Sequence, residues 1–193
     1  MHEEKHTFYS YLEEMSDKRR SALMEIYQDY KHLFHRAKGS THNHQAWEGG
    51  YADHLAECFL INNTVYEALQ SIRPLPFTKD SAVVALFFHD IEKPFKNLES
   101  DDKTVLYWQD HQEKTQKSWE KIKFDILDAM KEAYKFDLSD DEINALLYTH
   151  GEGEDYQKTK RVMTPLAAHV HNCDTTSARI WPDFARQNTF NAL

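Results

Sequence analysis

The stretch SAVVALFFHDIEKP, residues 81–94, constrains the fold of this chain more than any other. Its first eight residues are apolar almost all round, and a helix that is apolar on every side is buried. His89 and Asp90 follow side by side, and we expect Pro94 to end the helix. A buried carboxylate beside an imidazole must be paired, neutralised or bound to a metal ion. We interpret this helix end as part of a metal site.

The composition predicts an all-α protein. Only five glycines and five prolines occur in 193 residues, with long runs free of both, and such runs favour helices. The length suits one domain with a proper hydrophobic core. We therefore expect a single-domain helical bundle. Within it, residues 1–40 would form a helical segment packing on the core, 41–180 the core, and 181–193 a tail.

Hydrophobic spacing and capping signals place the helices. Apolar residues recur three and four apart over 16–36, 51–71, 106–134 and 162–177, which is the period of an amphipathic helix. We expect the long third segment to break near Asp110. Ser139 and Glu142 fit a capping box before a short helix that ends near His150. Thr78 or Asp80 can cap the buried helix.

Charge limits the partners that the chain can bind. The formal net charge is −9, and such a surface repels an extended nucleic-acid backbone. A small phosphorylated substrate stays possible, because a metal ion can reverse the local potential. An oligomer is compatible with the sequence.

We expect neither a membrane span nor a signal peptide. No apolar run approaches the ~18 residues that span a bilayer, and the acidic N-terminus lacks the pattern of a signal peptide. We expect a cytoplasmic protein without a membrane partner. Cys58 and Cys173 have no CxxC spacing, so we expect them to be reduced and buried.

Histidine is unusually frequent, at 12 of 193 residues, and dispersed along the chain. Histidine is the commonest metal ligand and a proton carrier near neutral pH. Where a histidine or carboxylate meets the apolar stripe of an expected helix, it becomes a candidate ligand. The order along the chain is H…HD…H…H…D, formed by His54, His89, Asp90, His111, His150 and Asp174.

At these residues the chain resembles the HD-domain superfamily of metal-dependent phosphohydrolases. The resemblance covers about two-thirds of the chain. Its segments are GGYADH (Gly49–His54), FFHDIEKP (Phe87–Pro94), DHQEKTQKSW (Asp110–Trp119), YTHGEG (Tyr148–Gly153) and HNCD (His171–Asp174). It implies hydrolysis of a phosphoester or phosphoanhydride by attack of a metal-activated water, on a nucleotide or nucleotide-like substrate. Glu92 departs from the pattern, since glycine is common there.

The additional histidines resemble the binuclear branch of the superfamily. This implies one ion on His54, His89 and Asp174, a second on His111 and His150, and Asp90 between the two. Imidazole and carboxylate ligands without thiolate suit two ions of Mn, Fe, Co, Ni or Zn.

Each candidate ligand also has a purely structural interpretation. His89 and Asp90 can form a buried ion pair or a helix-end cap. His54 and Asp174 can be satisfied core residues, and His111 a surface histidine at a helix start. His150 can be a favourable cation at a helix C-terminus. His169 or His171 can replace part of the ligand set.

Four residues are candidate substrate contacts. Lys93 lies one turn after His89 and can donate to a phosphate, and we assign it a catalytic role together with Asp90. His44 lies in the loop ten residues before His54, and His171 one turn before Asp174. The last candidate is Arg179, while a basic run at Lys158, Lys160 and Arg161 is more often solvated.

The sequence therefore predicts an enzyme, an HD-domain phosphohydrolase or phosphodiesterase. The same ligand order also resembles di-iron HD-fold oxygenases, so oxygen chemistry is an alternative. A catalytically silent binding or regulatory module is a second alternative.

Overall fold

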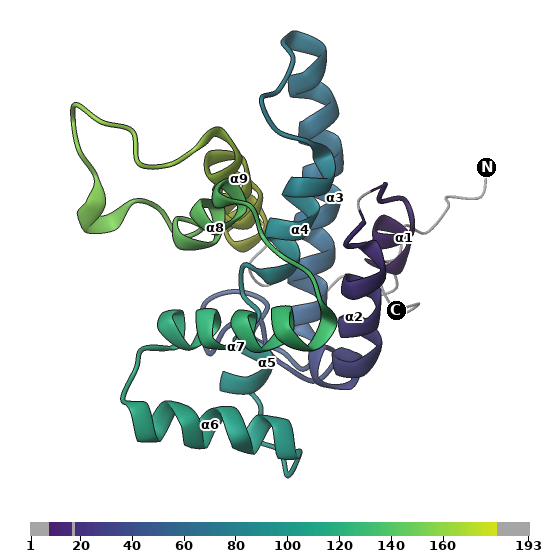
Figure 1. The fold of residues 1–193 in the computed structure, drawn as a ribbon, viewed down its shortest axis with the longest axis vertical. Coiled ribbons are helices and arrows are strands. Elements are labelled where there is room, and N and C mark those ends of the chain that lie inside the picture. Colours follow the sequence, from purple (N-terminus) through teal and green to yellow (C-terminus); the bar gives the residue numbers. More distant parts are fainter. Residues whose placement is uncertain (1–7, 17, 181–193) are drawn as a thin grey trace.

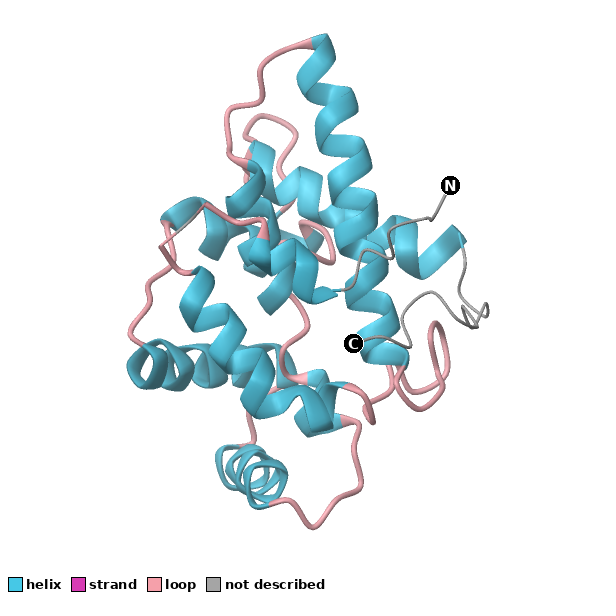
Figure 2. Ribbon diagram, turned by 90° about the vertical axis from the view of Figure 1, so that its right-hand side faces the viewer, coloured by secondary structure: helices cyan, strands magenta, loops and turns pink. Residues whose placement is uncertain are grey.

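The long helix α3 (Gly50–Ile72) is the axis of the computed structural model, which describes residues 8–16 and 18–180. Helix α4 (Lys79–Phe88) runs alongside it, and α9 (Pro165–Ile180) packs against both (Figure 1). Helix α8 (Asp140–Leu147) covers α4 and α9. The described residues contain helices and no strand (Figure 2). The all-α prediction is confirmed.

The remaining helices surround this centre. Helix α1 (Phe8–Glu13) packs on α2 (Arg20–Phe34) and on α3. Helix α2 also contacts the short α5 (Lys93–Lys96) and α7 (Trp119–Tyr134). Helix α6 (Lys103–Thr115) lies against α5 and α7 at the lower end of Figure 1. A long loop that contains the 3₁₀ turn η1 (Gly153–Asp155) joins α8 to α9.

Helix α4 is buried as its sequence predicts. Residues 82–88 are all buried, within one hydrophobic cluster that spans the described helices. The Phe87 ring packs edge-on against Phe88 at 4.8 Å between centroids, and Phe88 stacks on Phe136 at 5.2 Å. Burying each phenyl ring stabilises the fold by about 1.5–3 kcal/mol. The polar residues that follow Phe88 therefore enter a dry interior.

The capping signals read from the sequence form their hydrogen bonds. The Thr78 hydroxyl accepts from the Ser81 amide at 3.1 Å, so Thr78 caps α4, while Asp80 accepts from Ser16 instead. Both halves of the capping box join Ser139 to Glu142 at the start of α8. The caps give hydrogen-bond partners to main-chain N–H groups at the starts of α4 and α8 that have none within the helix.

Three local expectations were wrong. Helix α4 ends at Phe88, and Pro94 instead lies in the first turn of α5, where its missing N–H costs nothing. The long segment breaks at Gln116, which has a φ of 54°, and not near Asp110, which lies within α6 and pairs with Lys114 one turn on. The first amphipathic helix begins at Arg20 and not near residue 16.

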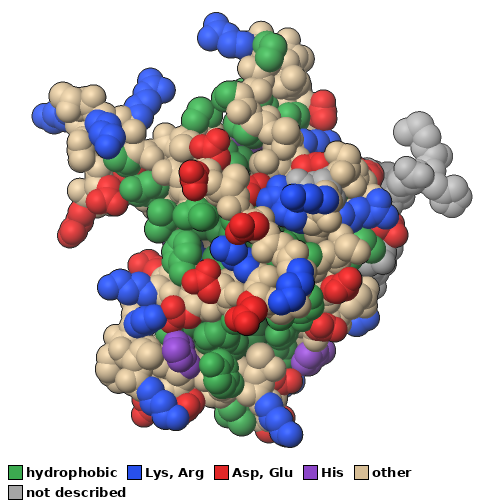
Figure 3. Space-filling view, viewed as in Figure 1, with side chains coloured by type: hydrophobic (Ala, Val, Ile, Leu, Met, Phe, Trp, Pro, Cys, Tyr) green, Lys and Arg blue, Asp and Glu red, His purple; other side chains and the backbone are tan. Residues whose placement is uncertain are grey.

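The surface carries charges of both signs. In the face that Figure 3 shows, basic and acidic side chains are interspersed and do not form a single acidic patch. None of the described helices has the length and apolarity needed to cross a bilayer. The expected tail over 181–193 lies outside the described residues.

Candidate metal centre

Four buried side chains from distant parts of the chain meet beside the end of α4. His54 comes from α3, His89 and Asp90 follow α4, and Asp174 comes from α9; the exposed fractions are 0, 0, 0 and 6%. His54 Nε2 lies 3.2 Å from both His89 Nε2 and Asp174 Oδ1. His89 Nε2 lies 3.2 Å from Asp90 Oδ2. These four residues could hold a metal ion.

The spacing of the cluster fits neighbouring ligands of one ion. Two nitrogen ligands ~2.1 Å from an ion and ~90–110° apart lie about 3.0–3.4 Å from each other. The 3.2 Å separation of His54 Nε2 and His89 Nε2 falls in that range. A central cation would accordingly touch both rings without a rearrangement of the helices.

The hydrogen bonds of His54 place its proton on Nδ1 and leave Nε2 unprotonated. Ser177 Oγ donates to the Glu57 carboxylate at 2.8 Å, so its own lone pair faces His54 Nδ1 at 2.9 Å. His54 Nδ1 therefore carries the proton and donates to Ser177. Burial lowers the pKa of His54 to about 4, which keeps the ring neutral near pH 7. Its Nε2 therefore faces the Asp174 carboxylate as a second acceptor.

His89 is oriented in the same way by the main chain. Its Nδ1 lies 2.6 Å from the Leu86 carbonyl, which can only accept, so Nδ1 must donate and Nε2 points into the cluster. Such a hydrogen bond on the far nitrogen is the usual support of a metal-binding histidine. The two Nε2 atoms then face each other, and either a proton or a cation between them must relieve the repulsion.

Asp90 and Asp174 carry the negative charge of the cluster. Burial alone would raise the pKa of Asp90, but the charges of Lys93 and His89 outweigh it and hold that pKa well below its usual range. The pKa of Asp174 is also lowered: burial would raise it, but the neighbouring imidazoles of His54 and His89 stabilise the carboxylate. Both carboxylates are ionised and ready to bind a cation.

Asp90 has buried lone pairs that no hydrogen bond satisfies. Neither carboxylate oxygen accepts a hydrogen bond of normal geometry. The Lys93 ammonium instead forms a close ion pair with Oδ2, and the Lys93 side chain is only 12% exposed. An oxygen that is buried, charged and without a hydrogen bond fits a metal ligand.

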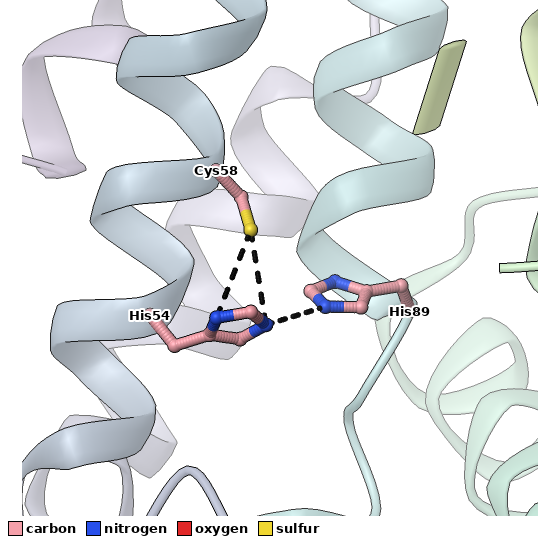
Figure 4. Close-up of side chains that lie close together, drawn as sticks. All are labelled: His54, Cys58 and His89. Carbon is pink, nitrogen blue, oxygen red and sulfur yellow. Dashed lines mark hydrogen bonds between the residues drawn. The ribbon is translucent and has the colours of Figure 1, made fainter. Parts of the chain in front are cut away.

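Cys58 lies one turn beyond His54 on α3 and completes a second possible ligand group with His54 and His89. Its sulfur lies 3.8 Å from His54 Nε2 and 4.0 Å from Nδ1, so it sits over the ring and not along the Nε2 lone pair (Figure 4). Burial raises the pKa of the Cys58 thiol well above 9.0. This geometry makes Cys58 a packing neighbour of the cluster. Both Cys58 and Cys173 are free and buried.

A cavity of about 630 Å³ opens beside the cluster. Asp174 and His150 lie in its wall and next to the other candidate ligands, since His150 Nε2 is 3.5 Å from Asp90 Oδ1. The His150 side chain is 51% exposed. Three of the candidate substrate contacts line the same cavity, namely His44, His171 and Arg179.

The imidazoles of the cavity wall are held by neighbouring groups. His171 Nδ1 donates to the Thr149 carbonyl at 2.5 Å, which leaves Nε2 for a ligand. Burial, followed by the charge of Lys93, lowers the pKa of His44. Lys93 itself does not line the cavity; its ammonium lies on Asp90.

The structure does not bring His111 to this cluster. Its Nε2 lies 3.0 Å from Asp125 Oδ2 on α7, and its ring stacks on Tyr107. Asp125 also pairs with Lys117 at 2.6 Å. Helix α6 contacts α5 and α7, so His111 serves the contact between α6 and α7.

Several buried polar residues beside the site were not foreseen. Glu57 and Ser177 orient His54, and Gln45 hydrogen-bonds both of them. Lys123 of α7 donates to the carbonyls of His89 and Leu146 at 3.2 and 2.9 Å. Glu57 follows His54, and Ser177 follows Asp174, by three residues on the same helix, so the sequence spacing could have pointed to both. No sequence pattern points to Gln45 or Lys123.

No family model, curated protein or solved structure matches the chain. Its interpretation therefore rests on its own residues: an all-helical fold with a buried His/Cys/Asp cluster that could bind a metal ion and is compatible with an HD-like site.

Proposed function

We propose that the protein is a metal-dependent phosphohydrolase of the HD-domain type, acting on a nucleotide or nucleotide-like phosphate. The ion would be held by His54, His89, Asp90 and Asp174, and His150 would face it from the side of the cavity. The cation would be Mn, Fe, Co, Ni or Zn, which suit imidazole and carboxylate ligands. The order of these residues along the chain is the order found in the superfamily that the sequence resembles.

One observation carries the proposal. His54 Nε2, His89 Nε2 and Asp174 Oδ1 converge within 3.2–3.8 Å in a dry interior. Such atoms repel one another unless a proton or a cation lies among them, and a divalent ion can take the place of the proton. Because Asp174 also lines the cavity, a substrate there would lie next to the ion.

Three residues near the proposed ion would contribute to hydrolysis. When bound, a divalent ion supplies Lewis acidity and lowers the pKa of a bound water. Arg179 in the cavity wall offers a planar guanidinium that matches two phosphate oxygens. His150 stands between cluster and cavity, where it can pass a proton to the leaving oxygen. Lys93 compensates the charge of Asp90 through their ion pair and would be a further cation beside the ion.

His111 is not part of the proposed centre. The sequence pattern predicts a second ion on His111 and His150, but the partner of His111 in the structure is Asp125. The proposal is therefore one ion per chain.

The test compares two aspartates that each contact a histidine. Metal-stripped protein is reloaded with each of the five metals, bound metal is measured, and phosphate release is followed on nucleotides, cyclic nucleotides and dinucleotides. Asp174→Asn should lose most of the bound metal and the activity. The matched change Asp125→Asn, at the His111 contact, should keep both.

Other outcomes would replace the proposal. Oxygen uptake by the iron-loaded protein without phosphate release would favour the oxygenase alternative. Full metal occupancy without turnover of any substrate would indicate a binding module, and absence of bound metal would refute the metal centre.

A further inference from the structure

A buried glutamine connects the metal cluster to the wall of the cavity. Gln45 lies in the loop between α2 and α3, and its side chain is almost completely buried. One end of its amide faces Glu57 and Ser177, and the other faces His44. No role follows for Gln45 from the ligand pattern, because it lies outside every motif segment.

The orientation of the amide is set by its partners. Gln45 Nε2 donates to Glu57 Oε2 at 3.0 Å and lies 3.4 Å from the Ser177 main-chain oxygen. A carboxylate and a carbonyl only accept hydrogen bonds, so the amide nitrogen must point to this side. The amide oxygen, Oε1, consequently points to His44.

The amide oxygen then decides which nitrogen of His44 carries the proton. Gln45 Oε1 lies 2.6 Å from His44 Nδ1. Since an amide oxygen can only accept, Nδ1 must be the donor, and Nε2 of the neutral ring keeps its lone pair. His44 lines the cavity beside Asp174 and Arg179. The cavity wall therefore gains a hydrogen-bond acceptor.

The backbone holds Gln45 in an unfavourable conformation. Its φ is 41°, in the left-handed region that costs a non-glycine residue about 1 kcal/mol or more. The Gly39 amide donates to the Gln45 carbonyl at 3.0 Å, and a side chain at Gly50 would lie 1.9 Å from the same oxygen. The packing thus imposes the strained conformation, and strain that is kept in this way is a feature of functional sites.

We propose that Gln45 is a positioning residue that keeps the proton of His44 on Nδ1, so that His44 Nε2 accepts a hydrogen bond from a substrate hydroxyl. The hydroxyl would neighbour the phosphate, as on the sugar of a ribonucleotide. The same amide also braces the chain from Glu57 through Ser177 to His54. The choice of substrate rests on the proposed function, whereas the position of the proton does not.

Nuclear magnetic resonance of ¹⁵N-histidine protein tests the proton directly. Two-bond ¹H–¹⁵N correlations on metal-free protein distinguish Nδ1–H from Nε2–H, and the His44 signal is assigned by its loss in His44→Gln. The wild-type ring should be protonated on Nδ1. In Gln45→Met, which keeps the side-chain length, the proton should move mainly to Nε2. Gln109→Met is the matched control. Gln109 lies on α6 and donates to the carbonyls of Phe95 and Leu98, so its loss should leave the His44 signal unchanged.

A second arm measures substrate choice in the metal-loaded protein. The probes are adenosine 3′-monophosphate and its 2′-deoxy analogue. The wild type should prefer the ribose compound, and Gln45→Met should reduce that preference roughly tenfold, the effect of about one hydrogen bond of 1.4 kcal/mol. If neither probe is hydrolysed, the substrate assignment of this inference fails, while the wider substrate screen tests the proposed function and the proton measurement still decides the role of Gln45.

A folding failure of Gln45→Met would not block the test. Gln45→Gly relieves the positive φ and removes the amide, so it should fold and show the same displaced proton. A wild-type His44 protonated on Nε2, or an unchanged His44 signal in both variants, would overturn the inference.

Discussion

The substitution Gly50→Ala tests the packing that joins the loop at Gln45 to α3, the helix that carries His54. Gly50 is the first residue of α3, and a Cβ there would lie 1.9 Å from the Gln45 carbonyl oxygen and 2.8 Å from its carbonyl carbon. Both are backbone atoms, so no side chain can turn away. The loop would have to move by more than an ångström.

The free energy follows from this displacement. Overpacking of a tight site costs about 1–3 kcal/mol or more, and the hydrogen bond from Gly39 to Gln45 adds about 1 kcal/mol when it is lost. We expect a destabilisation of about 3 kcal/mol, which lowers Tm by ~6–12 °C in a chain of this size. Without the contact, alanine in a helix would instead stabilise by up to ~1 kcal/mol. The sign of the change in unfolding free energy therefore shows whether the close contact between Gly50 and Gln45 exists.

Urea denaturation followed by circular dichroism measures the effect, and Gly153→Ala is the matched control. Gly153 has a φ of 52° but nothing within 4 Å of its added Cβ, so only the left-handed backbone costs about 1 kcal/mol. A Gly50→Ala protein as stable as the wild type, or more stable, would refute the close approach of the loop and with it the bracing of His54.

Three further outcomes are expected. Addition of a divalent ion at ~100 times its Kd should raise the unfolding free energy by about 2.7 kcal/mol, and chelation should reverse this; an unchanged Tm contradicts the metal site. His111→Ala should leave bound metal unchanged, because its partner is Asp125; a loss of metal would place His111 in a second ion site. Lys123→Met should destabilise by about 2–4 kcal/mol in urea, since two buried carbonyls lose their donor. The change Lys131→Met on the same helix, at a surface ion pair, should cost under ~1 kcal/mol.

Much of the fold follows from rules that act over a few residues. The apolar run at 82–88 predicts a buried helix whatever its neighbours are, because every face must avoid water. The caps at Thr78 and Ser139 are also local, since each joins a side chain to an amide three residues on. The break at Gln116 escaped prediction because no glycine or proline marks it.

The pattern of ligand types also lies in the sequence, and the structure brings His54, His89, Asp90 and Asp174 together. Helical periodicity places His54 and Asp174 on apolar stripes, the apolar run at 82–88 leads His89 and Asp90 into the interior, and a buried polar group needs a partner. What periodicity cannot give is the partner itself. His111 has the same local appearance, yet helix packing directs it to Asp125.

Only the tertiary structure decided how the candidate ligands are held. Gln45 and Ser177 are 132 positions apart, and Lys123 is 34 positions from the carbonyl of His89 to which it donates. Such contacts depend on how α3, α7 and α9 pack, and side-chain spacing within one helix carries no information about them. The sequence alone shows which groups a buried helix end must satisfy; the packing of distant helices determines which residues satisfy them.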